Sequence, residues 1–161
     1  MIPHYDLIGE FDVSLDTKGR FRMPSNLLKK LGDTERLTFV IRKGWDPHLT
    51  LYPKPVWDAL VAELNQRSEL DPRVKRYAQA FWTGANEVSL DSADRILLPK
   101  RLQAYAEGVK SLILTARNDK LEIWTEAEYN KLTETSAAEL EALGAELFGG
   151  SAPVPPSPTT P

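Results

Sequence analysis

The sequence predicts an α+β protein in which one structural unit occurs twice along the chain. Three observations predict this class: a 16-residue segment recurs 75 positions later, short runs of alternating polarity flank Asp-containing turns, and helical patterns follow them. The 161 residues, of which 42% are hydrophobic and 27% charged, have the composition of a globular protein. Each half holds only about 70 residues, near the lower limit for an independent core, so we expect the halves to pack against each other.

The repeat joins residues 9–24 to residues 84–99. Seven positions are identical, namely Gly9/Gly84, Val13/Val88, Ser14/Ser89, Leu15/Leu90, Asp16/Asp91, Arg20/Arg95 and Pro24/Pro99. The similarity continues downstream, where residues 37–41, 49–52 and 56–60 correspond to residues 112–115, 121–124 and 128–132. We therefore expect each half to run strand, turn, strand, short helix, strand, turn, strand, helix.

The first half is expected to begin with a hairpin. Residues 13–15 and 21–23 alternate in polarity on either side of a turn. In that turn, the Asp16 side chain can bond the backbone two residues on, and Gly19 can take a positive φ. Pro24 then suits the first turn of a short helix with one apolar face, formed by Leu27, Leu28 and Leu31.

Two longer helices are predicted before the second repeat. Residues 55–66 carry an apolar stripe at helical spacing, formed by Val56, Trp57, Leu60, Val61 and Leu64. Asp71 is expected to cap the next helix, whose buried side is formed by Val74, Tyr77, Ala78 and Phe81. This gives a first repeat over residues 5–70, a connecting helix over 71–83 and a second repeat over 84–135.

The C-terminal part differs in composition from the two repeats. Between residues 125 and 148 there are six glutamates and one basic residue, Lys131, and we expect an acidic helix over residues 136–148. Residues 149–161 contain five prolines, no charge and no aromatic residue, which is typical of a disordered tail.

Composition excludes several classes of function. The chain has no cysteine, so thiol nucleophiles and cysteine-containing metal sites are excluded. His4 and His48 lie far apart without metal-ligand spacing, and His48 is expected at the surface of a turn; we expect no metal site. No catalytic or phosphate-binding motif is found, so we expect no enzyme activity, no cofactor and no small-molecule substrate.

No signal peptide or membrane span is predicted, which favours a cytoplasmic protein. The net charge of −3 means that any DNA binding depends on local charge.

The motif Leu-Asp-x-Lys-Gly-Arg-x-x-x-Pro at residues 15–24, with its second copy at 90–99, resembles the MraZ family of bacterial transcriptional regulators. The resemblance covers roughly residues 5–135 and excludes the acidic helix. It implies an AbrB-like fold in which two pseudo-symmetric β-α-β-β halves interleave into one swapped-hairpin barrel, with peripheral helices. It also implies a ring-shaped homo-oligomer that binds short direct repeats in double-stranded DNA, upstream of the division and cell-wall gene cluster.

By the family's pattern, Lys18 and Arg20 fall on DNA-contacting positions, and Arg95 is the corresponding arginine of the second half. Arg22 is added because it lies two residues from Arg20 and can bond guanine or phosphate. Asp16, Gly19 and Asp91 are expected to hold the turns. The second copy has Ala93-Asp94 in place of Lys18-Gly19, which removes a cation and adds a carboxylate. We therefore expect the first half to dominate DNA contact.

The resulting expectation is a non-enzymatic, nucleoid-associated repressor that occludes promoters, including that of its own gene. The alternative from another class is an oligomeric scaffold or antitoxin-like module without specific DNA binding. In that case the acidic helix or the proline-rich tail binds a protein partner. Loss of a DNA complex on replacing Arg20 distinguishes the two.

Overall fold

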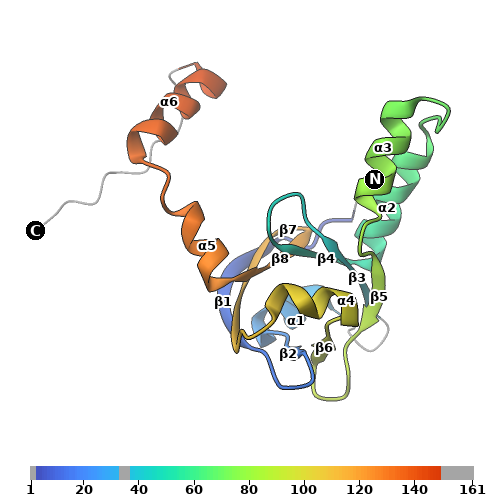
Figure 1. Cartoon of the computed structure of the whole chain (residues 1–161), viewed down its shortest axis with the longest axis vertical. Coiled ribbons are helices and arrows are strands. Elements are labelled where there is room, and N and C mark those ends of the chain that lie inside the picture. Colours follow the sequence, from blue (N-terminus) through green and yellow to red (C-terminus); the bar gives the residue numbers. More distant parts are fainter. Residues whose placement is uncertain (1–2, 33–36, 150–161) are drawn as a thin grey trace, which may run out of the picture. The chain divides into compact units, whose positions relative to one another are not determined.

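The computed structural model describes residues 3–32 and 37–149, and the chain divides into two units, Met1–Glu128 and Tyr129–Pro161 (Figure 1). The strands of the first unit are β1 (Leu7–Ser14), β2 (Arg20–Arg22), β3 (Thr38–Lys43), β4 (Leu49–Pro53), β5 (Asn86–Ser89), β6 (Arg95–Leu97), β7 (Ser111–Asn118) and β8 (Lys120–Thr125). Its helices are α1 (Ser25–Leu31), α2 (Lys54–Asn65), α3 (Pro72–Phe81), α4 (Lys100–Gln103) and the 3-10 helix η1 (Ala104–Ala106). Helix α5 (Glu126–Leu132) runs into the second unit, which also holds α6 (Ala137–Phe148).

The sheet topology has a pseudo-twofold axis. Six antiparallel strands are ordered β1-β7-β8-β4-β3-β5, and β2 pairs with β6 in a separate two-stranded sheet. Exchanging β1–β4 with β5–β8 reverses the order of the large sheet and leaves every pairing intact. The predicted α+β class, built from two equivalent repeats, is therefore confirmed.

Strands are exchanged between the repeats. The predicted hairpin forms as a turn, but its two strands do not pair with each other beyond it. Instead β1 pairs with β7 along its whole length, and β2 pairs with β6. The hairpin prediction is wrong in this respect, because each strand finds its hydrogen-bonding partner in the other repeat. The described strands form two sheets, so their pairing does not by itself form one closed barrel.

The register corrects one predicted correspondence between the repeats. Val13 pairs with Leu112 and its equivalent Val88 pairs with Phe39, so Phe39 corresponds to Leu112. The sequence comparison placed Leu37 there. Because side chains of a strand alternate with a period of two, a two-residue shift keeps the same residues on the buried face and leaves the apolar pattern unchanged.

One core fills the space between the two sheets. Phe21 and Ile96 face each other across β2 and β6 and are 1% and 0% exposed. They pack with residues from the ends of these strands, from α1 and α4 and from the inner face of the large sheet, namely Met23, Leu98, Leu27, Leu102, Ile41, Leu51, Leu114 and Ile123. Both repeats therefore contribute to the same apolar cluster, as their small size predicts.

Helices α2 and α3 run side by side (Figure 1). Their Val56, Trp57 and Phe81 pack against Val40 of β3 and Tyr52 of β4. The Asp71 side chain accepts a hydrogen bond from the backbone of Arg73 and caps α3, as predicted. Phe81 of α3 is buried and stacks on Trp57 of α2, with ring centroids 4.7 Å apart. Tyr77 was predicted on the buried side, but it is exposed because it lies at the edge of this contact.

Helix α6 begins with a capping box, in which Ser136 and Glu139 bond each other's backbone. None of its side chains is buried among the described residues. The predicted tail lies outside the described residues from position 150 onward. Within residues 3–32 and 37–149, no helix combines the length and the apolarity needed to cross a membrane.

Replacing Phe21 with alanine is expected to lower the free energy of unfolding by about 3–5 kcal/mol, because a buried aromatic ring is removed from the shared core. Urea unfolding followed by circular dichroism measures the change. The control is Ile8→Ala, at a position that is 77% exposed, which should change stability by less than about 0.5 kcal/mol. A loss below about 1 kcal/mol for Phe21→Ala would contradict a core that depends on the β2–β6 pair.

Candidate nucleic-acid interface

The first turn is closed by its own backbone and by one carboxylate. The Asp16 backbone N donates to the Arg20 carbonyl at 2.9 Å, and Gly19 N donates to the Asp16 carbonyl at 3.0 Å. Oδ1 of Asp16 accepts from the backbone N of Lys18 and of Arg20, both at 2.9 Å. Oδ2 accepts from Nε of Arg20 at 2.7 Å. Asp16 thus fixes both the turn and the direction of the Arg20 guanidinium.

Gly19 is required by the first turn for two reasons. Its φ of +85° lies in the left-handed region, which strains residues with a Cβ. A Cβ at this position would also lie 2.8 Å from the side-chain amide of Gln103. That amide is held in place because it donates to the Leu98 carbonyl at 2.8 Å.

The second turn has the same bonds with different residues. Oδ1 of Asp91 accepts from the backbone N of Ala93 and of Arg95, both at 2.9 Å, and Oδ2 accepts from Nε of Arg95 at 2.9 Å. Asp94 takes the position of Gly19 with a φ of +59°. Aspartate is one of the few residues with a Cβ that enters the left-handed region. The turn therefore keeps its shape without the Lys-Gly pair.

The two turns are bonded to each other's repeat. Leu98 N donates to the Gly19 carbonyl at 2.9 Å, and Met23 N donates to the Asp94 carbonyl at 2.8 Å. Figure 1 shows the turns side by side next to β2 and β6. The first turn, the second turn and the two-stranded sheet therefore form one rigid surface.

Three arginines lie on the outer face of this small sheet. Phe21 and Ile96 point into the core, so the alternating positions Arg20, Arg22 and Arg95 point outward, with Leu97 as the fourth. Arg22 lies directly opposite Arg95 in the register. The structure therefore brings together the residues predicted to bind DNA on one surface, with Lys18 exposed on the adjoining turn.

Two further lysines beside the first turn were missed by sequence reasoning. Lys100 and Lys110 line a surface depression of about 580 Å³ together with Thr17, Gly19 and Glu107. Both lysines come from the second repeat and are exposed. Because both lysines are far from Lys18 in the sequence, no motif spacing links them to the first turn. They make the surroundings of the first turn more basic than Lys18 and Arg20 alone suggest.

Hydrogen bonding keeps both turn carboxylates ionised. The backbone N–H of Arg20 lowers the pKa of the Asp16 carboxyl, and the backbone N–H of Arg95 does the same to the pKa of Asp91. Because the folded-state pKa is lowered, each interaction is present above the ordinary aspartate pKa and is lost as the pH falls through the lowered value. At neutral pH both turns therefore hold their arginine through a charged pair.

The two turns differ in charge although they share one geometry. The first turn presents Lys18 and the guanidinium of Arg20, whereas the second presents Arg95 and the carboxylate of Asp94, which is exposed. An added carboxylate repels phosphate, and a lost lysine removes one counter-charge. The surface around the first turn is therefore the better match for a polyanion.

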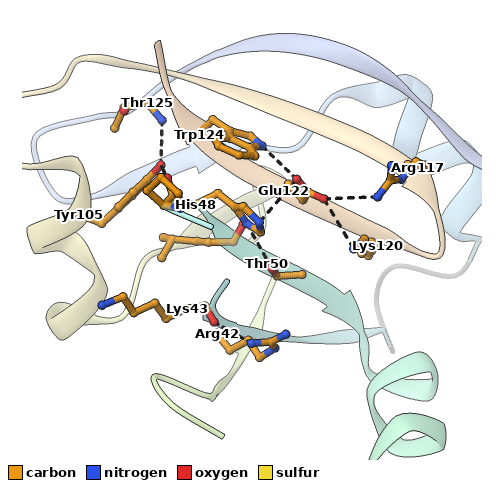
Figure 2. Close-up of polar contacts among 12 residues, drawn as sticks. Arg42, Lys43, His48, Thr50, Tyr105, Arg117, Lys120, Glu122, Trp124 and Thr125 are labelled. Atoms are coloured by element: carbon orange, nitrogen blue, oxygen red, sulfur yellow. Dashed lines mark hydrogen bonds and ion pairs between the residues drawn. The ribbon is translucent and has the colours of Figure 1, made fainter. Parts of the chain in front are cut away.

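The expectation for His48 is wrong, since its side chain is buried. The ring packs on Trp124 with centroids 4.6 Å apart, and its Nε2 lies 3.7 Å from Oε2 of Glu122 (Figure 2). Gly44 N donates to the His48 carbonyl, and a Cβ at Gly44 would lie 2.3 Å from the imidazole. The missing side chain at Gly44 makes room for the ring, which packs against Trp124 of β8. This cluster joins the two repeats at a place apart from the three arginines.

Comparison with known proteins gives a family match over most of the chain. The family model described as "MraZ protein, putative antitoxin-like" matches residues 7–78 and 81–149, that is, both repeats. The second match includes α6. The expectation that the acidic helix lies outside the family-like region is therefore wrong.

Relatives from several bacteria match over nearly the same length. A protein named Transcriptional regulator MraZ from Clostridium acetobutylicum is 35% identical over 129 residues, which is 80% of this chain and 88% of the relative. Proteins of the same name from Herpetosiphon aurantiacus and Heliobacterium modesticaldum are 32% and 31% identical, covering 84% and 88% of this chain and 92% and 96% of their own. With the same two-repeat organisation, these matches show that the chain belongs to the MraZ family.

Proposed function

We propose that this protein is a transcriptional regulator that represses genes by binding direct repeats in double-stranded DNA with the surface formed by β2, β6 and the first turn. Its targets are the promoter of the division and cell-wall gene cluster, including its own gene, and the protein acts in the cytoplasm at the nucleoid. The observation that carries the proposal is the grouping of Arg20, Arg22 and Arg95 on one outer face beside Lys18. The names of the relatives support a role in transcription.

The two-stranded sheet suits the major groove, which admits a two-stranded β-ribbon. Asp16 already engages Nε of Arg20, so the terminal NH₂ groups are the ones that bond guanine. Besides Arg20, the outer face of the same ribbon carries Arg22, which lies directly opposite Arg95. Lys18, at the turn, contacts phosphate and sets the register of the ribbon on the duplex.

Assembly into a ring raises the affinity of this small surface. A few cations bind DNA weakly at physiological salt. When several subunits of a homo-oligomer engage tandem repeats, each further contact forms at a high effective concentration. In the same proposal, the two sheets make up the swapped-hairpin barrel that presents the ribbon on one rim of the ring.

The second candidate function is a scaffold or antitoxin-like module that binds a protein. The description of the matching family as antitoxin-like favours it, as does the exposed apolar face of α6. In this case the strand exchange serves only to build the fold, and no specific DNA complex depends on Arg20.

Replacing Arg20 with alanine is expected to abolish specific DNA binding. The loss of binding free energy should be about 1–3 kcal/mol for each first turn whose arginine contacts a base. Arg95→Ala is the matched control, because it removes the equivalent arginine from the turn that carries Asp94. It should keep most of the affinity. Fluorescence anisotropy with DNA from upstream of the gene and with scrambled DNA measures both. Equal losses in the two variants would refute the dominance of the first turn, and unchanged specific binding in Arg20→Ala would favour the protein-binding module.

Lys18→Ala is expected to weaken binding to specific and scrambled DNA alike, because a lysine at the turn contacts phosphate. The slope of log affinity against log salt should fall by about one for each bound turn. Lys54→Ala is the control, since Lys54 lies on α2 and pairs with Asp58 at 2.6 Å. A loss confined to the specific sequence would mean instead that Lys18 contacts a base.

Introducing the first turn's Lys-Gly pair into the second turn should raise DNA affinity. The double substitution Ala93→Lys with Asp94→Gly adds a cation and removes a carboxylate, and glycine accepts the φ of +59° at position 94. The control is Ala93→Gln with Asp94→Gly, which lacks the new positive charge. Titrations at several salt concentrations compare the two. If the lysine variant binds no more tightly than its glutamine control, then the second turn does not face DNA.

A further inference from the structure

Helix α6 presents an apolar stripe that no described residue of its own unit covers. Leu140, Leu143 and Leu147 follow the spacing i, i+3, i+7 and lie on one face of the helix. Each of the three side chains is at least half exposed. Three large apolar side chains in a row on a helix are typical of a surface that is buried by a partner.

The helix has little to stabilise it alone. It is 12 residues long and no side chain in it is buried. Isolated helices of about 12–15 residues are marginal in water, and Gly144 in the middle lowers helix propensity further. The capping box stabilises the first turn only. The helix therefore depends on burying its leucine stripe against another surface.

A groove between α2 and α3 offers such a surface in the first unit. It encloses about 640 Å³, and its apolar lining consists of Leu60, Leu64, Val74, Tyr77 and Phe81. The exposed ring of Trp45 lies 5.5 Å from Tyr77 and extends the apolar area at one edge. The groove thus has the apolar character and the size to receive large aliphatic side chains.

The charges of helices α6 and α3 are opposite in sign. Residues 137–148 contain Glu139, Glu141 and Glu146 and no basic residue. Residues 72–81 of α3 contain Arg73, Lys75 and Arg76 and no acidic residue. Arg67 and Arg73 also line the groove, together with Glu63 and with Asp71, whose carboxylate pairs with Arg73 at 2.8 Å. An acidic helix is therefore attracted to the α3 side and oriented by it.

We propose that α6 of one copy of this chain docks with Leu140, Leu143 and Leu147 in the α2–α3 groove of a second copy. A helix lying in an apolar groove is a common recognition mode, in which residues at i, i+3 and i+7 are the anchors. Since the donor helix and the acceptor groove are different surfaces, the contact is heterologous and adds subunits head to tail, so it closes a ring when the rotation permits. The inference gives the proposed homo-oligomer a specific interface and does not depend on DNA binding.

The absence of cysteine from the chain allows a direct test by disulfide cross-linking. One full-length variant carries Leu143→Cys and another carries Val74→Cys; they are mixed, allowed to exchange subunits and oxidised. A disulfide between residues 143 and 74 of different chains is expected, identified by mass spectrometry of the joined peptides. The matched control replaces Leu143→Cys with Ala142→Cys, one residue away and about 100° around the helix axis, outside the leucine stripe. Its cross-link should be about tenfold weaker because the thiol is not held at the groove.

A second measurement uses the assembled protein without cross-linking. Leu143→Asp should lower the mass measured by light scattering, whereas Ala142→Asp should leave it unchanged; circular dichroism checks that both remain folded. Equal cross-linking of residues 142 and 143, or an unchanged mass in Leu143→Asp, would overturn the proposal. So would a disulfide formed only within one chain by a Val74→Cys/Leu143→Cys double variant. Binding of each variant to DNA is scored separately, so that failure of this interface is distinguishable from failure of the DNA-binding proposal.

Discussion

The pairing of β2 with β6 is the interaction on which both the fold and the candidate DNA surface depend. Each of these three-residue strands has its partner in the other repeat, and neither repeat can complete the pair alone. The inward side chains, Phe21 and Ile96, are almost fully buried, and each contributes about 1.5–3 kcal/mol of hydrophobic stabilisation. Because side chains alternate along a strand, the same pairing directs Arg20, Arg22 and Arg95 outward. The stability of the fold and the proposed DNA recognition therefore depend on two faces of one small ribbon.

The turns beside this ribbon keep their geometry while their charge differs. In each turn a single aspartate holds two backbone N–H groups and the Nε of an arginine. Those bonds leave the two positions before the arginine open to other residues, provided that the second of them accepts a left-handed φ, as both Gly19 and Asp94 do. A duplicated unit can in this way retain its fold in both copies while one copy keeps the basic surface. Lys100 and Lys110 of the second repeat add positive charge beside the first turn.

Much of this arrangement could be predicted from the sequence, and the limits have physical causes. Local patterns identified the turns around Asp16 and Asp91 and the cap at Asp71, because these features depend on residues a few positions apart. The exchange of strands could not be predicted from alternation, which identifies the buried face of a strand but not its neighbour. For the same reason alternation could not show that Leu112 corresponds to Phe39 rather than to Leu37, two residues earlier. The burial of His48 depends on the gap above Gly44 and on Trp124, which is distant in sequence.

In the proposed function, the wild-type protein distinguishes its own upstream DNA from other DNA through a charged ribbon. The most direct measurement is a titration of the wild type with DNA from upstream of its gene and with a scrambled duplex of equal length and composition, across a salt series. We expect a large preference for the upstream DNA that persists as salt rises, on top of a sequence-independent affinity that falls steeply. Equal affinity for both duplexes at every salt concentration would contradict it.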